Sequence, residues 1–303
     1  MPGLLKKKLR RYFSLYLLFI PVLLYYFIYR WQPMFYAIIL SFTKFSLRGG
    51  IFGSKWVGFA NIQRLFASYD FTEVLLNTME IALLRVVIGF IPPILLAILL
   101  HDLKYRGFVR VSQTLLYIPH FFSWVVVFGI AWAFFATGSG MVNHWLTSVG
   151  KEPIEFLMSP RLFRPLIIGT ALWKELGWGT IIYLASLSTI DPGLYEAAAV
   201  DGAGPLRRIW HITLPELKPI MVFILTISMG SILYAGGEQI LLFYNPATYG
   251  VGDVIDTWVY RRGLLDMDFS LASAAGLFQS CFGLLFVLAA NKAARRFAGI
   301  GLW

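Results

Sequence analysis

Residues 74–101, VLLNTMEIALLRVVIGFIPPILLAILLH, form an apolar run long enough to cross a lipid bilayer. A transmembrane helix needs about 20 apolar residues, because each residue adds about 1.5 Å across a hydrocarbon core about 30 Å thick. Similar runs recur along the chain, and the sequence predicts an all-α integral membrane protein with six transmembrane helices. The predicted spans are residues 12–41, 74–101, 109–136, 163–189, 219–237 and 269–291.

The composition agrees with a multi-pass membrane protein. Of the 303 residues, 58% are hydrophobic and only 14% are charged, and the mean hydropathy is +0.70. A soluble domain carries about 25% charged residues. The net charge of +10 does not indicate nucleic-acid binding, because the Lys and Arg residues lie in short clusters beside the apolar runs and not on one face of a soluble domain.

The distribution of cations predicts that both termini are cytoplasmic, because inner segments of membrane proteins are enriched in Lys and Arg. In this orientation the inner segments contain 14 of the 26 Lys and Arg residues, and the longer outer loops contain eight. The inner residues are Lys6, Lys7, Lys8, Arg10, Arg11, Lys104, Arg106, Arg110, Arg207, Arg208, Lys218, Lys292, Arg295 and Arg296. Segment 191–218 then faces the cytoplasm, and without linkers or repeats the chain is expected to form one domain, 1–303.

Segment 191–218 has the pattern of two short helices. Asp191-Pro192 is a typical helix start, with Asp as the N-cap and Pro at the first helical position. Three alanines follow and favour helix, until Gly204-Pro205 breaks it. A second helix is expected from Pro205, ending where Pro215 and Pro219 interrupt the backbone. A well-structured connection between two spans would have this pattern too.

The spacing within this segment resembles a known signature. Glu196-Ala197-Ala198, Gly202, Ile212 and Leu214-Pro215 reproduce the "EAA…G………I.LP" pattern of permease subunits in binding-protein-dependent ABC importers, and Asp201 and Ala203 match its common DGA core. Further stretches resemble the carbohydrate-uptake permeases related to the maltose transporter, and most of all the subgroup that imports fragments of alginate, rhamnogalacturonan or xylan. These stretches are KWVGFANIQRLF (55–66), LLNT (75–78), YIPHFFSWVVV (117–127), DVIDTWVY (253–260) and GLW (301–303).

The resemblance implies a type I importer permease in the cytoplasmic membrane of a bacterium, importing oligosaccharides released from polysaccharides. Its expected partners are a second homologous permease, two copies of an ABC ATPase and an extracytoplasmic solute-binding protein. Segment 191–218 would be the coupling loop that docks on the ATPase, with Glu196 pairing with an ATPase cation and Gly202 allowing close packing. The residues expected to couple are Glu196, Ala197, Ala198, Asp201, Gly202, Ala203, Ile212, Leu214 and Pro215.

ATP and magnesium are expected in the separate ATPase subunits. The sequence contains no G-x-x-x-x-G-K-[ST] loop to hold phosphates, and the nearest string, GGIFGSKW (49–56), lacks the Gly-Lys-Ser/Thr order. No cofactor is therefore expected on this chain, and it is not expected to be an enzyme. The four histidines have no metal-ligand spacing, so no metal site is predicted and His120 is taken as structural.

A substrate pathway is predicted from polar and aromatic residues inside the spans, because such groups usually face a bundle interior or a water-filled path. The fourth span offers two tryptophans, which present flat surfaces to sugar rings, beside a Lys-Glu pair; the fifth offers serines on one helical face. Each group could equally be structural, as an ion pair, a lipid contact or small residues at a helix interface. The candidates are Trp173, Lys174, Glu175, Trp178, Ser228, Ser231 and Glu238.

Two other functions are compatible with a multi-pass chain. A stand-alone secondary sugar transporter driven by an ion gradient generally needs intramembrane charge relays and often contains repeats. Only Arg85, Lys174 and Glu175 are plausible intramembrane charges, and no repeat is visible. A membrane glycosyltransferase would need clustered carboxylates or a nucleotide-sugar motif, and the sequence contains neither.

Overall fold

The computed structural model describes residues 12–302, with the side chain of Ser14 excepted. The described residues form helices and one short β-hairpin. They fall into two compact units, one consisting of residues up to 68 with 259–278, and the other of residues 69–258 with those from 279 onward. The inner cations predicted at Lys6, Lys7, Lys8, Arg10 and Arg11 lie outside the described residues.

The first unit begins with a long helical stretch. Helices α2 (Phe13–Tyr26) and α3 (Gln32–Ser41) are joined by a widened π turn, η1 (Phe27–Trp31). The prolines of this stretch lie on either side of that turn, Pro21 inside α2 and Pro33 in the first turn of α3. A proline in the first turn of a helix sacrifices no intrahelical bond, because that N–H has no partner within the helix.

An antiparallel hairpin follows, formed by β1 (Thr43–Ser46) and β2 (Gly50–Trp56), and helix α4 (Ala60–Ala67) packs beside it. The buried Asn61 amide donates to the carbonyls of Ser41 and Thr43, at 3.0 and 2.9 Å. The same unit contains η4 (Arg261–Leu265) and the start of α16 (Phe269–Ala298). The prediction of an all-α chain is therefore wrong here, because a turn at Gly50, with φ +62°, and these bonds stabilise two short strands.

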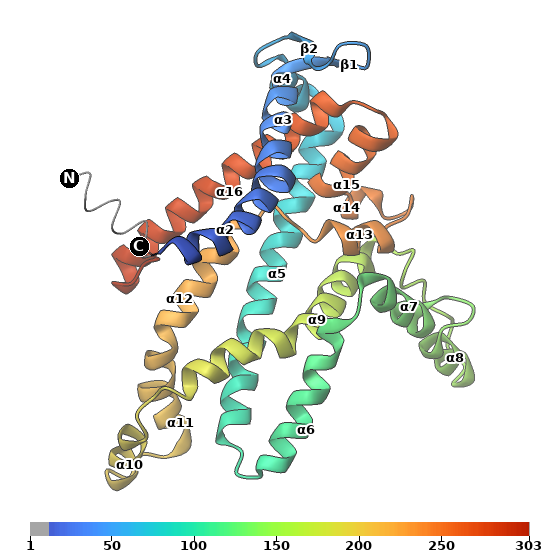
Figure 1. Ribbon diagram of the computed structural model, residues 1–303. Coiled ribbons are helices and arrows are strands. Elements are labelled where there is room, and N and C mark those ends of the chain that lie inside the picture. The colour runs from blue at the N-terminus through green and yellow to red at the C-terminus, as the bar shows by residue number, and fades with distance from the viewer. Residues whose placement is uncertain (1–11, 303) are drawn as a thin grey trace, which may run out of the picture. The chain divides into compact units, whose positions relative to one another are not determined.

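The second unit is built around two crossing helices, α5 (Tyr69–Asp102) and α9 (Pro160–Leu187), shown in Figure 1. Helix α5 remains one α-helix of 34 residues through Pro92-Pro93. Pro93 lies against Gly179, where a Cβ would be 3.3 Å from the proline ring. A buried cluster that includes Ala97, Tyr183 and Leu217 joins these helices to the fifth predicted span.

The third predicted span is broken. Residues 109–136 were expected to form one helix, but α6 (Arg106–Tyr117) and α7 (Trp124–Phe135) meet at an angle of 104°, with a 3₁₀ turn, η2 (Ile118–Phe121), between them. Pro119 in that turn lacks a donor, and the Ser123 hydroxyl accepts a bond of 3.4 Å from the Val126 N–H as the N-cap of α7. A second helix start therefore lies inside the apolar run.

The fifth predicted span begins earlier and ends sooner than 219–237. One continuous helical run is formed by α11 (Pro205–Arg208), the π turn η3 (Ile209–Thr213) and α12 (Leu214–Gly230).

The prediction that Pro215 and Pro219 interrupt the helix is wrong. Pro215 falls in the first turn of α12, and the preceding turn is widened, with the Leu214 N–H donating to the Ile209 carbonyl five residues back. After Gly230 come the short helices α13 (Gly237–Phe243), α14 (Tyr249–Gly252) and α15 (Ile255–Tyr260).

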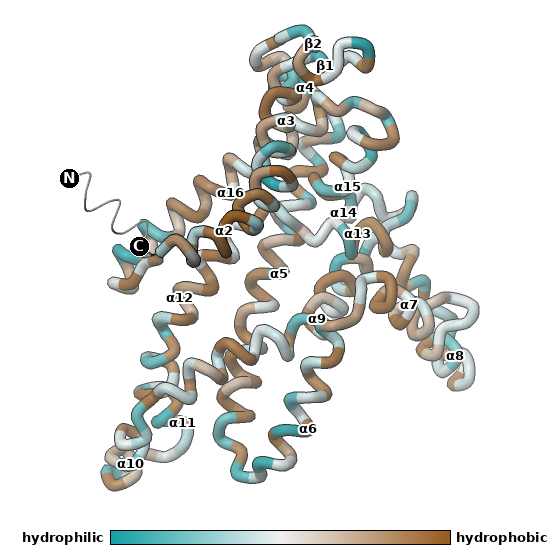
Figure 2. Tube along the Cα trace, in the orientation of Figure 1, coloured by the Kyte–Doolittle hydropathy of each residue, from teal (hydrophilic) through white to brown (hydrophobic). Residues whose placement is uncertain are grey.

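Within the described residues, four helical stretches are long and apolar enough to cross a membrane: Leu15–Ser41, Tyr69–Asp102, Pro205–Gly230 and Phe269–Ala298. The bent pair α6 and α7 makes a fifth if it counts as one span. Figure 2 shows the apolar residues along these helices and the more polar segments at their ends. Helix α9 is 28 residues long but less apolar, and a further short helix, α8 (Met141–Ser148), precedes it.

Candidate functional site

Segment 191–218, the predicted coupling loop, begins with a capped helix that follows α9. The Asp191 carboxylate accepts a 2.9 Å bond from the Gly193 N–H, and helix α10 (Pro192–Val200) follows. At its other end the Ala203 N–H donates to the Ala198 carbonyl at 2.8 Å, and the Gly202 N–H to the Ala199 carbonyl at 3.1 Å. This pair of bonds is the Schellman motif, in which the glycine takes a left-handed conformation; Gly202 has φ +78°.

The motif residues lie in one continuous segment, at the end of the second unit away from α13 and α14 (Figure 1). Most of them are accessible. Five are exposed: Glu196, Ala197, Asp201, Gly202 and Pro215; four are half-buried: Ala198, Ala203, Ile212 and Leu214. The loop is held to the rest of the unit by Leu214 and Ile209, which pack on the cluster around Leu217, and by a 3.0 Å bond between the Tyr195 and Thr213 hydroxyls.

Large apolar side chains remain exposed around the motif. Val200 is 89% exposed, Leu206 74% and Trp210 68%. The cation-rich surroundings of these residues argue against simple immersion in lipid, since Arg207 and Arg208 lie between Leu206 and Trp210. Exposed large apolar side chains among charged neighbours are typical of a surface that binds another protein.

Gly202 has a structural role that the motif alone did not reveal. A Cβ there would meet no heavy atom within 4 Å, so the backbone conformation of Gly202, and not its surroundings, requires glycine.

We expect Gly202→Val to lower uptake by the assembled transporter about tenfold, because a branched residue at positive φ costs about 1–2 kcal/mol or more. Gly202→Asn should retain most of the activity, since Asn tolerates this conformation. Equal loss in both variants would contradict the capping role and favour close packing against a partner. The control is Gly204→Ala, because Gly204 has φ −68° and a Cβ there would meet no heavy atom within 4 Å.

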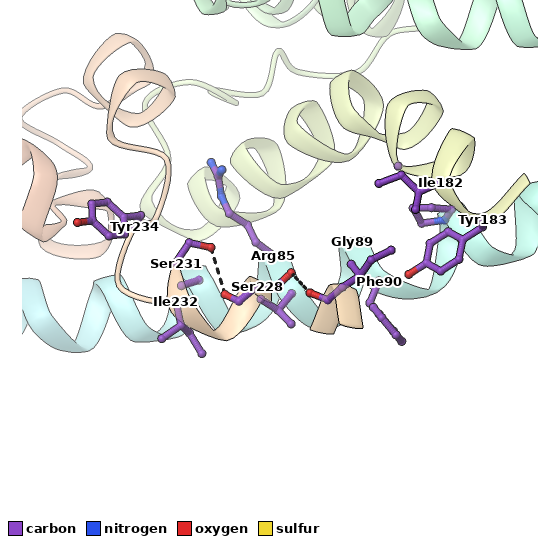
Figure 3. Close-up of a pocket in the computed structure, with 14 residues that line it drawn as sticks. Arg85, Gly89, Phe90, Ile182, Tyr183, Ser228, Ser231, Ile232 and Tyr234 are labelled. Atoms are coloured by element: carbon purple, nitrogen blue, oxygen red, sulfur yellow. Dashed lines mark hydrogen bonds between the residues drawn. The ribbon is translucent and has the colours of Figure 1, made fainter. Parts of the chain in front are cut away.

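Two cavities adjoin each other between α5, α9 and α12. The Ser228 cavity, about 320 Å³, is lined among others by Phe90, Tyr183, Ser228, Ser231 and Tyr234, and Figure 3 shows it. The Trp178 cavity, about 250 Å³, is lined among others by Leu172, Glu175 and Trp178. Both cavities share the residues Arg85, Gly89, Pro93 and Gly179.

The structure brings four of the seven predicted pathway residues to these cavities. Glu175 and Trp178 line one, and Ser228 and Ser231 line the other. The two serine hydroxyls donate to carbonyls of their own helix, at Ile224 and Ser228, and leave their lone pairs for other donors (Figure 3).

The other three predicted pathway residues lie elsewhere. Trp173 lines an apolar cavity between α7 and α9, beside Phe134 and Pro165. Lys174 is buried and donates to the His120 carbonyl at 2.5 Å, with Glu175 at 3.6 Å. Glu238 is exposed and lines neither the Ser228 nor the Trp178 cavity. Lys174 therefore fixes the turn between α6 and α7 in this structure.

His120 contacts two of the predicted pathway residues, although no sequence pattern singled it out. Its imidazole stacks on the Trp178 indole with ring centres 4.4 Å apart and planes 3° apart, and its Nδ1 lies 2.9 Å from a Glu175 carboxylate oxygen. One face of Trp178 is thus already covered, so only its other face is available for a sugar ring. Tertiary packing creates this contact, and a pattern of single residues does not predict it.

A second group was also missed, around the Arg85 guanidinium. Arg85 donates from Nη2 to the Gln239 amide oxygen, and the Gln239 Nε2 donates to the Ile167 carbonyl at 2.9 Å and the Thr170 hydroxyl at 2.7 Å. Gly236, with φ +81°, lies directly against the guanidinium, where a Cβ would overlap Arg85. The only sequence signal was the charge of Arg85 inside an apolar run.

Comparison with known proteins gives consistent matches over most of the chain. Residues 89–298 match the family described as binding-protein-dependent transport system inner membrane component. Two proteins of Bacillus subtilis (strain 168) are each 40% identical over 95% of this chain: Protein LplB, covered over 91% of its length, and the polygalacturonan/rhamnogalacturonan transport system permease protein YteP, covered over 90%.

Solved structures give the same result. A chain of a bacterial alginate ABC transporter in complex with alginate pentasaccharide-bound periplasmic protein is 36% identical, with a TM-score of 0.89 over 98% of this chain and 99% of that one. A chain of a bacterial ABC transporter involved in the import of the acidic polysaccharide alginate is 37% identical, with a TM-score of 0.89 over 97% and 99%.

Proposed function

This chain belongs to the family of inner membrane components of binding-protein-dependent transport systems, and from that premise we propose that it is a permease subunit of an ATP-driven oligosaccharide importer. It forms half of a translocation path for breakdown products of polysaccharides. The functions of similar proteins, polygalacturonan/rhamnogalacturonan transport and alginate import, support this substrate class. The chain resides in the cytoplasmic membrane of a bacterium.

One structural observation carries the proposal. The helical run from Pro205 to Gly230 is unbroken and 26 residues long, or about 39 Å at 1.5 Å per residue. One end adjoins the exposed motif residues of α10, and Ser228 near the other end lines a cavity between helices. A displacement of the coupling loop would therefore be passed along this helical run to the cavity wall.

The remaining architecture belongs to the same proposal. The chain is one permease domain of six transmembrane helices in a type I importer, with α9 as the fourth span, the bent pair α6 and α7 as the third and both termini in the cytoplasm. It pairs with a second homologous permease and two ABC ATPase subunits. Those subunits bind ATP and magnesium, whereas this chain has no nucleotide site of its own, and an extracytoplasmic binding protein delivers the sugar.

Residue roles follow from the position of each group. The coupling contacts with the ATPase come from Glu196, Ala197, Ala198, Asp201, Gly202 and Ala203, while Ile212, Leu214 and Pro215 join this surface to α12. The sugar passes Glu175, the free face of Trp178, Ser228 and Ser231. Three predicted pathway residues line neither cavity: Trp173, Lys174 and Glu238. Their positions do not support a direct contact with the sugar.

Uptake by a reconstituted complex tests the proposal. Proteoliposomes containing this chain, its partner permease and the ATPase should accumulate a labelled oligogalacturonate only when ATP and the loaded binding protein are both supplied. Omitting either component should reduce uptake to the level of empty vesicles. Uptake by this chain alone, driven by a proton or sodium gradient, would contradict the proposal and identify a secondary transporter.

A further inference from the structure

Arg85 occupies a central position between the two cavities. It lies in α5, a helix long and apolar enough to span the membrane, and it lines both the Ser228 cavity and the Trp178 cavity. Figure 3 shows its side chain rising from α5 beside Ser228 and Ser231. A cation at this place is expensive for the protein, because a charged side chain inside a membrane domain loses its hydration.

The protein does not neutralise this cation by direct contact. Within residues 12–302, Arg85 forms no ion pair with a carboxylate, and Glu175 and Asp256 act on it only from beyond ion-pair distance. Its Nε is buried and has no hydrogen-bond partner in the described part of the chain. The single bond from Nη2 to Gln239 leaves the other N–H donors of the guanidinium without an acceptor among the described residues.

A purely structural role explains this arrangement poorly. Gln239 is already fixed by the bonds that its Nε2 donates to the Ile167 carbonyl and the Thr170 hydroxyl. A neutral donor would therefore be enough to satisfy its amide oxygen. A guanidinium differs from a neutral donor in its positive charge and in its planar set of N–H groups, which match a carboxylate through two parallel bonds. The unpaired cation in a cavity wall therefore indicates an anionic ligand.

The surroundings define that ligand further. The Ser228 cavity is lined by Ser228, Ser231, Tyr183 and Tyr234 beside apolar side chains, a mixture of polar and apolar residues suited to a sugar ring. Glu175 lines the neighbouring cavity and would repel a second negative charge there. At about 320 Å³ the Ser228 cavity is near the lower limit of about 300 Å³ for ligand pockets, so it fits a short part of a chain.

We propose that Arg85 binds the carboxylate of a uronate residue as the oligosaccharide passes through the Ser228 cavity. This inference rests on the proposed transport function and adds the substrate class: acidic oligosaccharides. Arg85 is then a specificity-determining residue of the permease itself, in addition to any selection by the binding protein.

Direct binding to the assembled permease–ATPase complex, without the binding protein, tests the proposal. The two probes are trigalacturonate and its fully methyl-esterified form, which has the same rings but no charge. The wild-type complex should bind the acid at least tenfold more tightly than the ester. Arg85→Gln should bring this ratio close to one, with the affinity for the ester changed less than about twofold, whereas Arg85→Lys should retain a preference for the acid.

Each other result counts against the proposal. An unchanged ratio in Arg85→Gln, or an equal loss of both probes, would show that Arg85 only supports the fold. Should Arg85→Gln fail to assemble, the wild-type complex still decides, because equal affinity for acid and ester excludes a carboxylate site. ATP-driven uptake of trigalacturonate in the presence of the binding protein tests the transport function separately, so a failure of this inference is distinguishable from a failure of that function.

Discussion

Replacing Glu196 with alanine is expected to abolish the stimulation of ATP hydrolysis by the loaded binding protein while the permease stays folded. The Glu196 side chain is exposed on α10 and has no ion-pair partner among the residues that the structure describes, so its removal leaves no unsatisfied group within this chain. Loss of one partner from a charge pair at an interface costs about 2–5 kcal/mol, which corresponds to about 30-fold or more in coupling. ATP hydrolysis and uptake, measured on the same proteoliposomes, should fall together.

Glu216→Ala is the matched control for this prediction. Glu216 is also an exposed carboxylate at the start of α12, but it lies outside the motif. It should leave coupling within about twofold, since an exposed surface charge contributes about 1 kcal/mol or less. Normal coupling in Glu196→Ala, or equal losses in both variants, would contradict the assignment of the docking surface.

Gly236→Ala is expected to destabilise the second unit strongly. The residue precedes α13 with φ +81°, a conformation that costs a non-glycine residue about 1–2 kcal/mol, and its added Cβ would overlap the Arg85 guanidinium. Displacement of Arg85 would also break its bond to the buried Gln239, so we expect a total loss of about 3 kcal/mol. The midpoint of thermal unfolding of the purified complex measures this loss.

Two variants separate the causes. Gly89→Ala lies in the same cavity wall on α5 with no heavy atom within 4 Å of the new Cβ, and it should leave the midpoint nearly unchanged. Truncation of Arg85 to alanine in the Gly236→Ala background should recover part of the stability, because it removes the steric overlap. An additive double variant would show that Arg85 and Gly236 do not interact.

The sequence predicted most reliably what depends on neighbouring residues. The apolar run of α5 and the start of α10 are determined locally, by hydrophobic length and by the Asp191 N-cap; the end of α10 was predicted at Gly204-Pro205, whereas the helix ends at Val200 with Gly202 in the left-handed conformation. The family resemblance also follows from a contiguous motif, and the matching family and relatives confirm it. Local patterns are sufficient for such elements because each interaction lies within a few residues along the chain.

The effect of each proline on its helix could not be predicted from the local sequence. The third predicted span bends at Pro119 and Ser123. Helix α5, in contrast, continues through Pro92 and Pro93. Pro215 was tolerated because it coincides with a helix first turn after a widened π turn. The spacing of the prolines along the chain does not by itself decide between these outcomes.

The site residues that were missed are those held by long-range contacts. Arg85 and Gln239 are separated by 154 positions, and His120 and Glu175 by 55. Trp173 and Lys174 were predicted with Glu175 and Trp178 because they are neighbours in sequence, yet successive helical residues point in different directions. Only the packing of α9 against α5 and against the turn before α7 separates the residues of the cavities from the others.

Photo-crosslinking within the assembled transporter tests the central claim most directly. A benzoylphenylalanine at position 200, where Val200 is 89% exposed beside the motif, should form an adduct with the ATPase subunit. The same probe at position 52, where Phe52 is 78% exposed in the hairpin on the expected outer side, should form none. An ATPase adduct from position 52, or none from position 200 in a complex that still imports sugar, would contradict the proposed coupling surface.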